Sequence, residues 1–248
     1  MSSPVSPSEM VSVYRRLGLR SSVFAERFRQ LQENVSNCEK IKHSNSCSRC
    51  RRTKPKPCKL HACPRCLRRI LGPLRRVVRS WFLKHKHLNL QRIVLRVPFS
   101  VPSKDLANAV TKLKLAVKKL LRGEKPWPRP LRGYLARIHV DVIPPQPDSK
   151  SSRFQFSIFL VADCGGVEQT ALASRWKDLL GNAGIRRRAP RSVLVEIDDV
   201  GGRRKKVLRW VVPTSSALLR CMPKSPFSAS SYLEILPQLC KVVTGRVS

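Results

Sequence analysis

Acidic residues are scarce in this sequence: its 248 residues include only 15 Asp and Glu, against 50 Lys and Arg. The formal net charge at pH 7 is therefore +35. A folded chain with this imbalance repels itself unless a polyanion or an anionic surface lies against it. The shortage of acids makes nucleic acid the first partner to consider.

Long apolar runs are also absent. A membrane-spanning helix needs about 18 uncharged apolar residues, and no stretch of this sequence comes close to that length. Residues 1–35 also lack the apolar core of a secretory signal. An organelle presequence is the alternative for the Arg- and Ser-rich start, but Glu9 and Glu26 argue against it. We therefore expect a cytoplasmic protein with no membrane partner. Its hydrophobic content of 42% is enough to bury a globular core.

Cysteine, in contrast, is well represented, and six of the nine cysteines lie between Cys38 and Cys66. A reducing cytosol favours metal ligands and buried thiols over disulfides. Two Cys-x-x-Cys pairs enclose twelve residues, and each pair can present two thiolates to one ion. Four thiolates favour a closed, structural Zn²⁺ over a catalytic ion, which needs an open position. The predicted zinc ligands are Cys47, Cys50, Cys63 and Cys66.

Other potential ligands lie close to these pairs. Cys58 and His61 stand between them, and Cys38 and His43 precede them. An alternative ligand set or a second, weaker site is therefore open. We favour the simpler interpretation, in which these four residues are spectator thiols and surface imidazoles.

The same region is strongly basic, since residues 51–80 hold 11 Lys and Arg and no acid. A small scaffold closed by a metal ion would present these side chains rigidly to phosphates. The predicted nucleic-acid-binding residues are Arg49, Arg51, Arg52, Lys54, Lys56, Lys59, Arg65, Arg68, Arg69, Arg75, Arg76 and Arg79.

Hydrophobic periodicity predicts helices over 22–35, 66–82, 103–122 and 172–180, and strands over 90–97, 134–142, 154–161, 193–197 and 207–212. This mixed order favours an α+β fold: a mostly antiparallel sheet with helices packed on one face, preceded by a zinc-ribbon-like module and a basic helix. Four parts are expected: a tail and amphipathic helix (1–45), the zinc module and its helix (46–82), the α+β domain (83–212) and a C-terminal appendage (213–248).

A specific series of features runs from about Cys47 to Val212. The cysteine cluster ends in Cys63-Pro-Arg-Cys66 and leads into an Arg-rich helix, and the extended segment Ile93-Val-Leu-Arg-Val-Pro follows. A helix with a basic face comes next, followed by Leu-Arg-Gly-Tyr-Leu-Ala-Arg-Ile-His-Val-Asp over 131–141, a hydrophobic strand, Trp176 on a helix, and Val-Leu-Val-Glu-Ile over 193–197. This order resembles the rolling-circle replication initiators of small plasmids.

The resemblance implies an origin-binding protein with a five-stranded sheet and a metal held by a His-hydrophobic-His strand. It also implies a tyrosine that nicks one DNA strand and stays attached to the 5′ phosphate. This chain departs from that pattern, because Ser157 and Phe159 stand where the family has histidines, and Trp210 stands where the tyrosine is expected. We therefore expect a degenerate nicking centre. The weak catalytic candidates that remain are Tyr232, His139 and Asp141.

These observations favour a DNA-binding protein of the replication-initiator type, with structural zinc and with DNA preferred over RNA. One alternative is an active metal-dependent DNA nickase with an atypical site. The other is a zinc-ribbon protein that binds RNA or associates with the ribosome, which the composition fits equally well.

Overall fold

The computed structural model describes residues 4–38, 58–85, 88–122, 126–128, 131, 133–143, 152–184, 195–200, 207 and 210–245. Within these residues, no helix combines the length and the apolar composition needed to cross a bilayer. The architecture is α+β, with one five-stranded antiparallel sheet.

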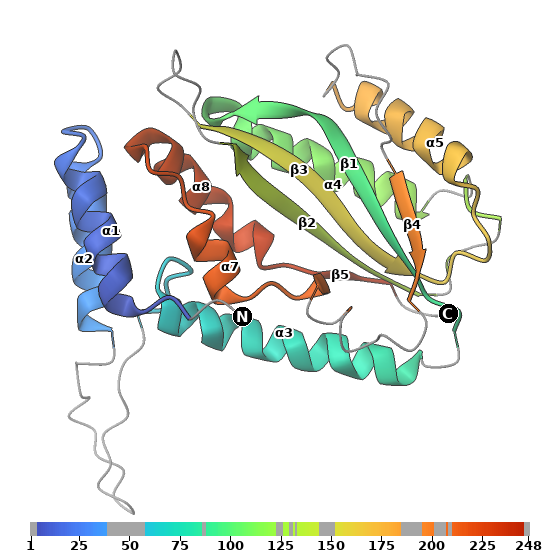
Figure 1. Ribbon diagram of the computed structural model, residues 1–248, viewed down its shortest axis with the longest axis horizontal. Coiled ribbons are helices and arrows are strands. Elements are labelled where there is room, and N and C mark those ends of the chain that lie inside the picture. The colour runs from blue at the N-terminus through green and yellow to red at the C-terminus, as the bar shows by residue number, and fades with distance from the viewer. Residues whose placement is uncertain are drawn as a thin grey trace, which may run out of the picture.

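The N-terminal residues form a helical hairpin in which α1 (Pro7–Leu19) packs against α2 (Ala25–Asn37) (Figure 1). Ser6 and Glu9 form a capping box that fixes the start of α1. The ring of Tyr14 stacks on that of Phe28, with 6.4 Å between centroids. Part of the segment expected to be a tail, Pro7–Leu19, is therefore a helix packed into the structure.

The basic helix is α3 (Pro64–Lys84), which runs through an exposed Pro73. Its start is favoured by Pro64 in the first turn, where a missing N–H costs no helical hydrogen bond. Its buried side carries apolar residues at helical spacing, including Leu67, Leu71 and Val78.

The sheet has the strand order β4-β1-β3-β2-β5, and the strands are β1 (Gln91–Pro102), β2 (Tyr134–Ile143), β3 (Arg153–Ala162), β4 (Val195–Asp199) and β5 (Val243–Thr244). A 3-10 turn, η1 (Ser103–Asp105), and helix α4 (Leu106–Arg122) connect β1 to β2, while α5 (Gln169–Asn182) connects β3 to β4. The first four strands and these two helices therefore follow the β-α-β-β-α-β order of the split βαβ motif.

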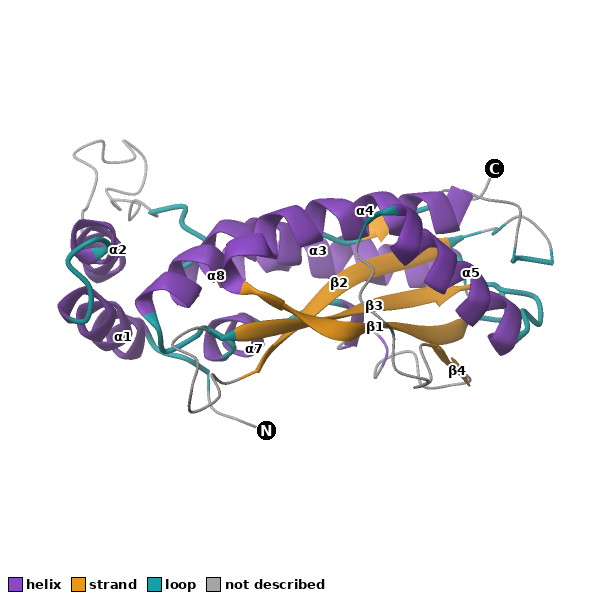
Figure 2. Cartoon of the chain, turned by 90° about the horizontal axis from the view of Figure 1, so that it is seen from above, coloured by secondary structure: helices purple, strands orange, loops and turns teal. Residues whose placement is uncertain are grey.

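Helices cover parts of both faces of the sheet, not one face as expected. Side chains of α4, α5 and α8 (Pro226–Leu239) share one apolar cluster with alternate residues of the strands, such as Ile93 and Ile158. Leu135 and Val161, on the opposite face, join a second cluster with Val78 of α3. Figure 1 shows α4 behind the sheet and α3 below it, and Figure 2, seen from above, again shows α4 along one side of the strands.

Two sequence-based expectations need correction. The segment predicted as a strand over 207–212 is helical at its described residues Val207, Trp210 and Val211, so it adds no strand. The strand predicted to end before Pro98 continues to Pro102, and its pairing with β3 shifts register between Arg96 and Ser100. This irregularity accommodates a proline, which cannot donate a ladder hydrogen bond.

The C-terminal segment is part of the core. It contains α7 (Ser215–Arg220), α8 and β5, and β5 pairs with β2. Ile235, Leu236 and Leu239 of α8 are buried in the same cluster as the inner face of the sheet. The segment expected as an appendage therefore covers the sheet and extends it.

Candidate metal centre and nucleic-acid interface

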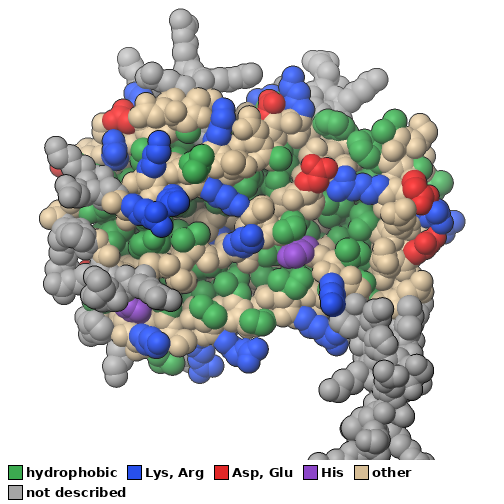
Figure 3. Space-filling view, turned by 180° about the vertical axis from the view of Figure 1, so that it is seen from behind, with side chains coloured by type: hydrophobic (Ala, Val, Ile, Leu, Met, Phe, Trp, Pro, Cys, Tyr) green, Lys and Arg blue, Asp and Glu red, His purple; other side chains and the backbone are tan. Residues whose placement is uncertain are grey.

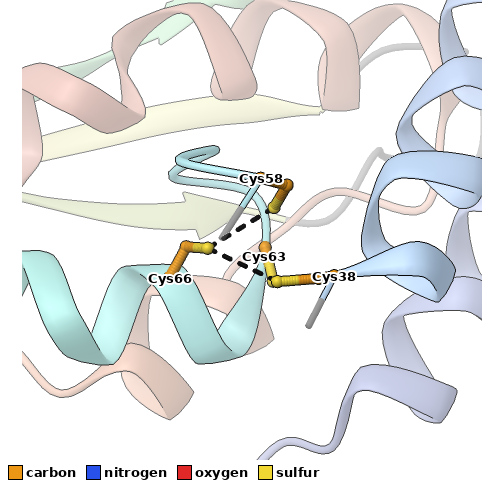
Figure 4. A group of neighbouring side chains, drawn as sticks. All are labelled: Cys38, Cys58, Cys63 and Cys66. Atoms are coloured by element: carbon orange, nitrogen blue, oxygen red, sulfur yellow. Dashed lines mark hydrogen bonds between the residues drawn. The ribbon is translucent and has the colours of Figure 1, made fainter. Parts of the chain in front are cut away.

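Four cysteines from three separate parts of the chain meet between α2 and α3 (Figure 4). The Sγ atoms of Cys38, Cys58, Cys63 and Cys66 all lie within 4.8 Å of one another. Cys66 Sγ is 3.6 Å from Cys38 Sγ and 3.4 Å from Cys58 Sγ. Tetrahedral coordination with Zn–S bonds of about 2.3 Å separates sulfurs by about 3.8 Å. The group can therefore hold one metal ion after small adjustments.

Local backbone structure positions each sulfur. Cys38 is the C-cap residue of α2, and Cys63 is the N-cap residue of α3, with Cys66 in its first turn. Lys59, directly after Cys58, has a φ of 60°, in the left-handed region, and the N–H of Cys63 donates to the carbonyl of Leu60. This tight turn brings Cys58 back toward the start of α3.

Backbone N–H groups donate to the sulfurs, as is favourable for metal-bound thiolates. Burial raises the pKa of Cys63 to about 11, against the opposing effect of the N–H groups of Cys66 and Arg65. Burial also raises the pKa of Cys58. For Cys38, burial opposes ionisation, but the N–H of Cys58 and the neighbouring thiols outweigh it and lower the pKa. The donors are in place to stabilise thiolates once a cation supplies the remaining charge.

The cluster differs from the predicted ligand set. Cys63 and Cys66 belong to it, but the other two sulfurs come from Cys38 and Cys58, which the sequence-based interpretation treats as spectators. Cys47 and Cys50 lie outside the described residues, so their predicted role stays a prediction. The sequence signal for Cys58 was its position five residues before Cys63. No sequence signal favoured Cys38, because its proximity depends on the packing of the N-terminal hairpin.

The candidate nucleic-acid interface is the exposed side of α3, which we call the basic stripe. At 100° per residue, six arginines of α3 fall within an arc of about 120° and span about 21 Å of the helix axis. They are Arg65, Arg68, Arg69, Arg75, Arg76 and Arg79. All are exposed except Arg65, which is half-buried and donates to the carbonyl of Cys38.

Acidic residues are absent from α3, so no intrahelical ion pair neutralises the stripe. Within the described residues, Arg75, Arg76 and Arg79 form no ion pair. The opposite side of the helix is fixed by Leu67, Leu71 and the second apolar cluster. Arg75, Arg76 and Arg79 are therefore unneutralised cations on a rigid support.

Of the remaining residues predicted to bind phosphate, the structure describes only one. Lys59 is exposed at the turn between two of the clustered cysteines. The predictions for Arg49, Arg51, Arg52, Lys54 and Lys56 fall outside the described residues and stay predictions.

The three catalytic candidates lie in two different settings. Tyr232 is 1% exposed and its hydroxyl donates to the carbonyl of Leu218 at 2.8 Å. Burial raises its pKa, so the nucleophilic phenolate is disfavoured. His139 and Asp141 do share one face of β2, with 3.1 Å between Nε2 and Oδ1. The hydrogen bond between His139 and Asp141 lowers the pKa of the Asp141 carboxyl group.

A stack of rings lies on the same face of the sheet. The ring of Phe159 packs against that of His139 at 4.8 Å and that of Trp210 at 4.3 Å, both nearly parallel. Arg137 lies over Phe159 and Arg92 over Trp210. The two residues that replace the expected histidine and tyrosine therefore contact each other in an aromatic stack. This contact provides ring packing and cation–π interaction.

Comparisons of this chain with protein-family models, curated proteins and solved structures find no match. The resemblance to rolling-circle initiators consequently stays a hypothesis that rests on the order of sequence features.

Proposed function

We propose that this protein binds nucleic acid through the basic stripe of α3, and that a structural zinc ion held by Cys38, Cys58, Cys63 and Cys66 fixes the start of that helix. The observation that carries the proposal is that six aligned arginines lie on the same helix whose first turn contributes to the cysteine cluster. Thiolate ligands alone favour zinc among the common divalent ions.

The arrangement fits phosphate binding for a geometric reason. Cations on one face of a rigid helix require little loss of backbone entropy when they meet a regular array of phosphates. The formal charge of +35 adds long-range attraction that accelerates association. DNA is the first ligand to test, because the order of sequence features resembles replication initiators. The proposal includes no catalytic step, because Tyr232 is buried and its hydroxyl donates a hydrogen bond to the carbonyl of Leu218.

RNA is the second candidate, and the ring stack on the sheet favours it. Single-stranded RNA is often bound by antiparallel sheets that carry aromatic and basic side chains. His139, Phe159 and Trp210 form such a combination with Arg92.

The test measures fluorescence anisotropy of labelled oligonucleotides with the full chain and with Arg75→Gln/Arg76→Gln/Arg79→Gln. Double-stranded DNA, single-stranded DNA and structured RNA are compared at one salt concentration. We expect the triple variant to bind all of them at least tenfold more weakly. The control removes three exposed arginines from the N-terminal hairpin: Arg15, Arg16 and Arg20. Equal loss in both variants would contradict the proposal, because only the total charge would then matter.

A further inference from the structure

A cavity of about 330 Å³ opens between α4, β2 and the end of α8, away from the cysteine cluster. Basic side chains at its wall are Lys114, Lys118, Arg122 and Lys241, and none of its described lining residues is acidic. Figure 3 shows this side of the molecule, where Lys and Arg side chains stand around a hollow surface. The cavity is therefore a concentration of positive charge in a recess.

The charges at the cavity are not neutralised by the protein. Within the described part of the chain, Lys114, Lys118, Arg122 and Lys241 form no ion pair. Lys114 donates to the side chain of Gln238. Burial and the nearby Lys241 lower the pKa of Lys114, so these two cations repel each other. An anion in the cavity would remove this repulsion.

The rest of the wall is apolar. Val117 and Leu121 of α4 face Ile138 and Ile158 of the sheet, and Tyr134 contributes an aromatic ring. Gly245 packs directly against that ring, where a Cβ atom would collide with it, so the ring is held in place. Inorganic phosphate would use the cations but leave this apolar surface without a partner.

We propose that this cavity binds one unstacked nucleotide of a bound single strand, with the phosphate at the lysines and the base against the apolar wall. Its volume is at the lower end of the range for small-ligand sites, about 300 to 1,000 Å³, and accommodates one nucleotide but no base pair. This inference rests on the proposed nucleic-acid function and deepens it, because it specifies unpaired nucleotides as the ligand.

The first test is calorimetric titration of the full chain with dAMP, deoxyadenosine and inorganic phosphate. We expect dAMP to bind most tightly, since it alone engages both parts of the wall. Binding of deoxyadenosine or of phosphate as tight as that of dAMP would overturn the inference, and so would absence of dAMP binding.

Matched variants of α4 locate the site. Lys118 lines the cavity, whereas the adjacent and equally exposed Lys119 does not. Lys118→Gln should weaken dAMP binding roughly tenfold, and Lys119→Gln should change it by less than about twofold. Equal effects would mean that total charge, not the cavity, binds the nucleotide. Tyr134→Ala should weaken dAMP binding while leaving phosphate binding unchanged.

Binding of a single-stranded nucleic acid at the cavity is tested with an oligonucleotide that carries 2-aminopurine, a base whose fluorescence rises when it is unstacked. The signal should rise on binding and fall again when excess dAMP is added, whereas a signal insensitive to dAMP contradicts the inference. The α3 triple variant separates the two proposals. It should bind dAMP normally and oligonucleotides weakly, so failure of the basic stripe and failure of the cavity give different results.

Discussion

The sulfurs of Cys38 and Cys66 lie 3.6 Å apart although the residues are separated by 28 positions. Their contact joins the end of the N-terminal hairpin to the first turn of α3. Two further bonds cross the same junction: Tyr14 donates to the carbonyl of Ala62 at 2.7 Å, and Arg65 donates to the carbonyl of Cys38 at 3.0 Å. An ion at this position would therefore connect the hairpin to the helix that carries the basic stripe.

Replacing Cys38 with serine should remove most of the bound zinc and destabilise the fold. One of four thiolates is lost, and the cost should be about 3 kcal/mol or more, which lowers the unfolding midpoint by about 10 °C. Metal analysis and thermal unfolding measure the two effects.

Two other cysteines provide controls for this experiment. Cys221→Ser changes a half-buried thiol outside the cluster and should leave one zinc per chain. Cys47→Ser distinguishes the two ligand sets. Zinc retained in Cys47→Ser but lost in Cys38→Ser agrees with the geometric set, and the reverse result would contradict it.

Salt dependence gives a quantitative measure of the basic stripe. Each phosphate neutralised on duplex DNA contributes about 0.9 to the slope of log K against log salt. Arg75→Gln/Arg76→Gln/Arg79→Gln should therefore reduce the magnitude of the slope by about 2 to 3. The hairpin variant that lacks Arg15, Arg16 and Arg20 should keep the original slope. An unchanged slope in the α3 variant would show that these arginines contact no phosphate.

Tyr232→Phe should affect stability and not nucleic-acid binding. The change leaves the buried carbonyl of Leu218 without its donor, at a cost of about 1 to 2 kcal/mol. Denaturant titration measures this loss, and anisotropy with labelled DNA measures binding. A magnesium-dependent nick with a covalent adduct in the original protein, absent from the variant, would restore Tyr232 as a catalytic residue.

Asp141→Asn should show a pH-dependent loss of stability. The hydrogen bond from His139 lowers the pKa of Asp141 below its ordinary 3.8 in the folded state. A depressed carboxyl pKa stabilises the fold above pH 3.8, and this contribution disappears as the pH falls through the folded-state value. Because the carboxylate is largely exposed, the effect at pH 6 should be about 0.5 kcal/mol. Denaturant titrations at pH 6 and pH 2.5 measure it.

A matched carboxylate on α5 controls for net charge. Asp178 is exposed, and Asp178→Asn makes the same change in charge. A loss for Asp141→Asn that persists at pH 2.5, or an equal loss for Asp178→Asn, would show that the His139 hydrogen bond is not its source.

Local pattern predicted the core strands and helices well. Alternation in β2 and the hydrophobic run of β3 placed both strands within one residue at each end, whereas α4 begins three residues later than predicted because Ser103–Asp105 form η1. The helical residues Val207, Trp210 and Val211 were mistaken for a strand. A short run of β-branched residues can form a helix or a strand, so its tertiary contacts determine its secondary structure. Here Val207 and Val211 are buried against the second apolar cluster.

The sequence by itself determined the charge, the amphipathic α3 with its six arginines and the involvement of Cys63 and Cys66, which are close in the chain and share one turn. Only the tertiary structure brought Cys38 and Cys58 to them, buried Tyr232 and enclosed the cavity between Lys118 and Tyr134. The reason is physical: neighbours within a helical turn meet through local geometry, whereas distant side chains meet only where burial of apolar surface has packed their elements together.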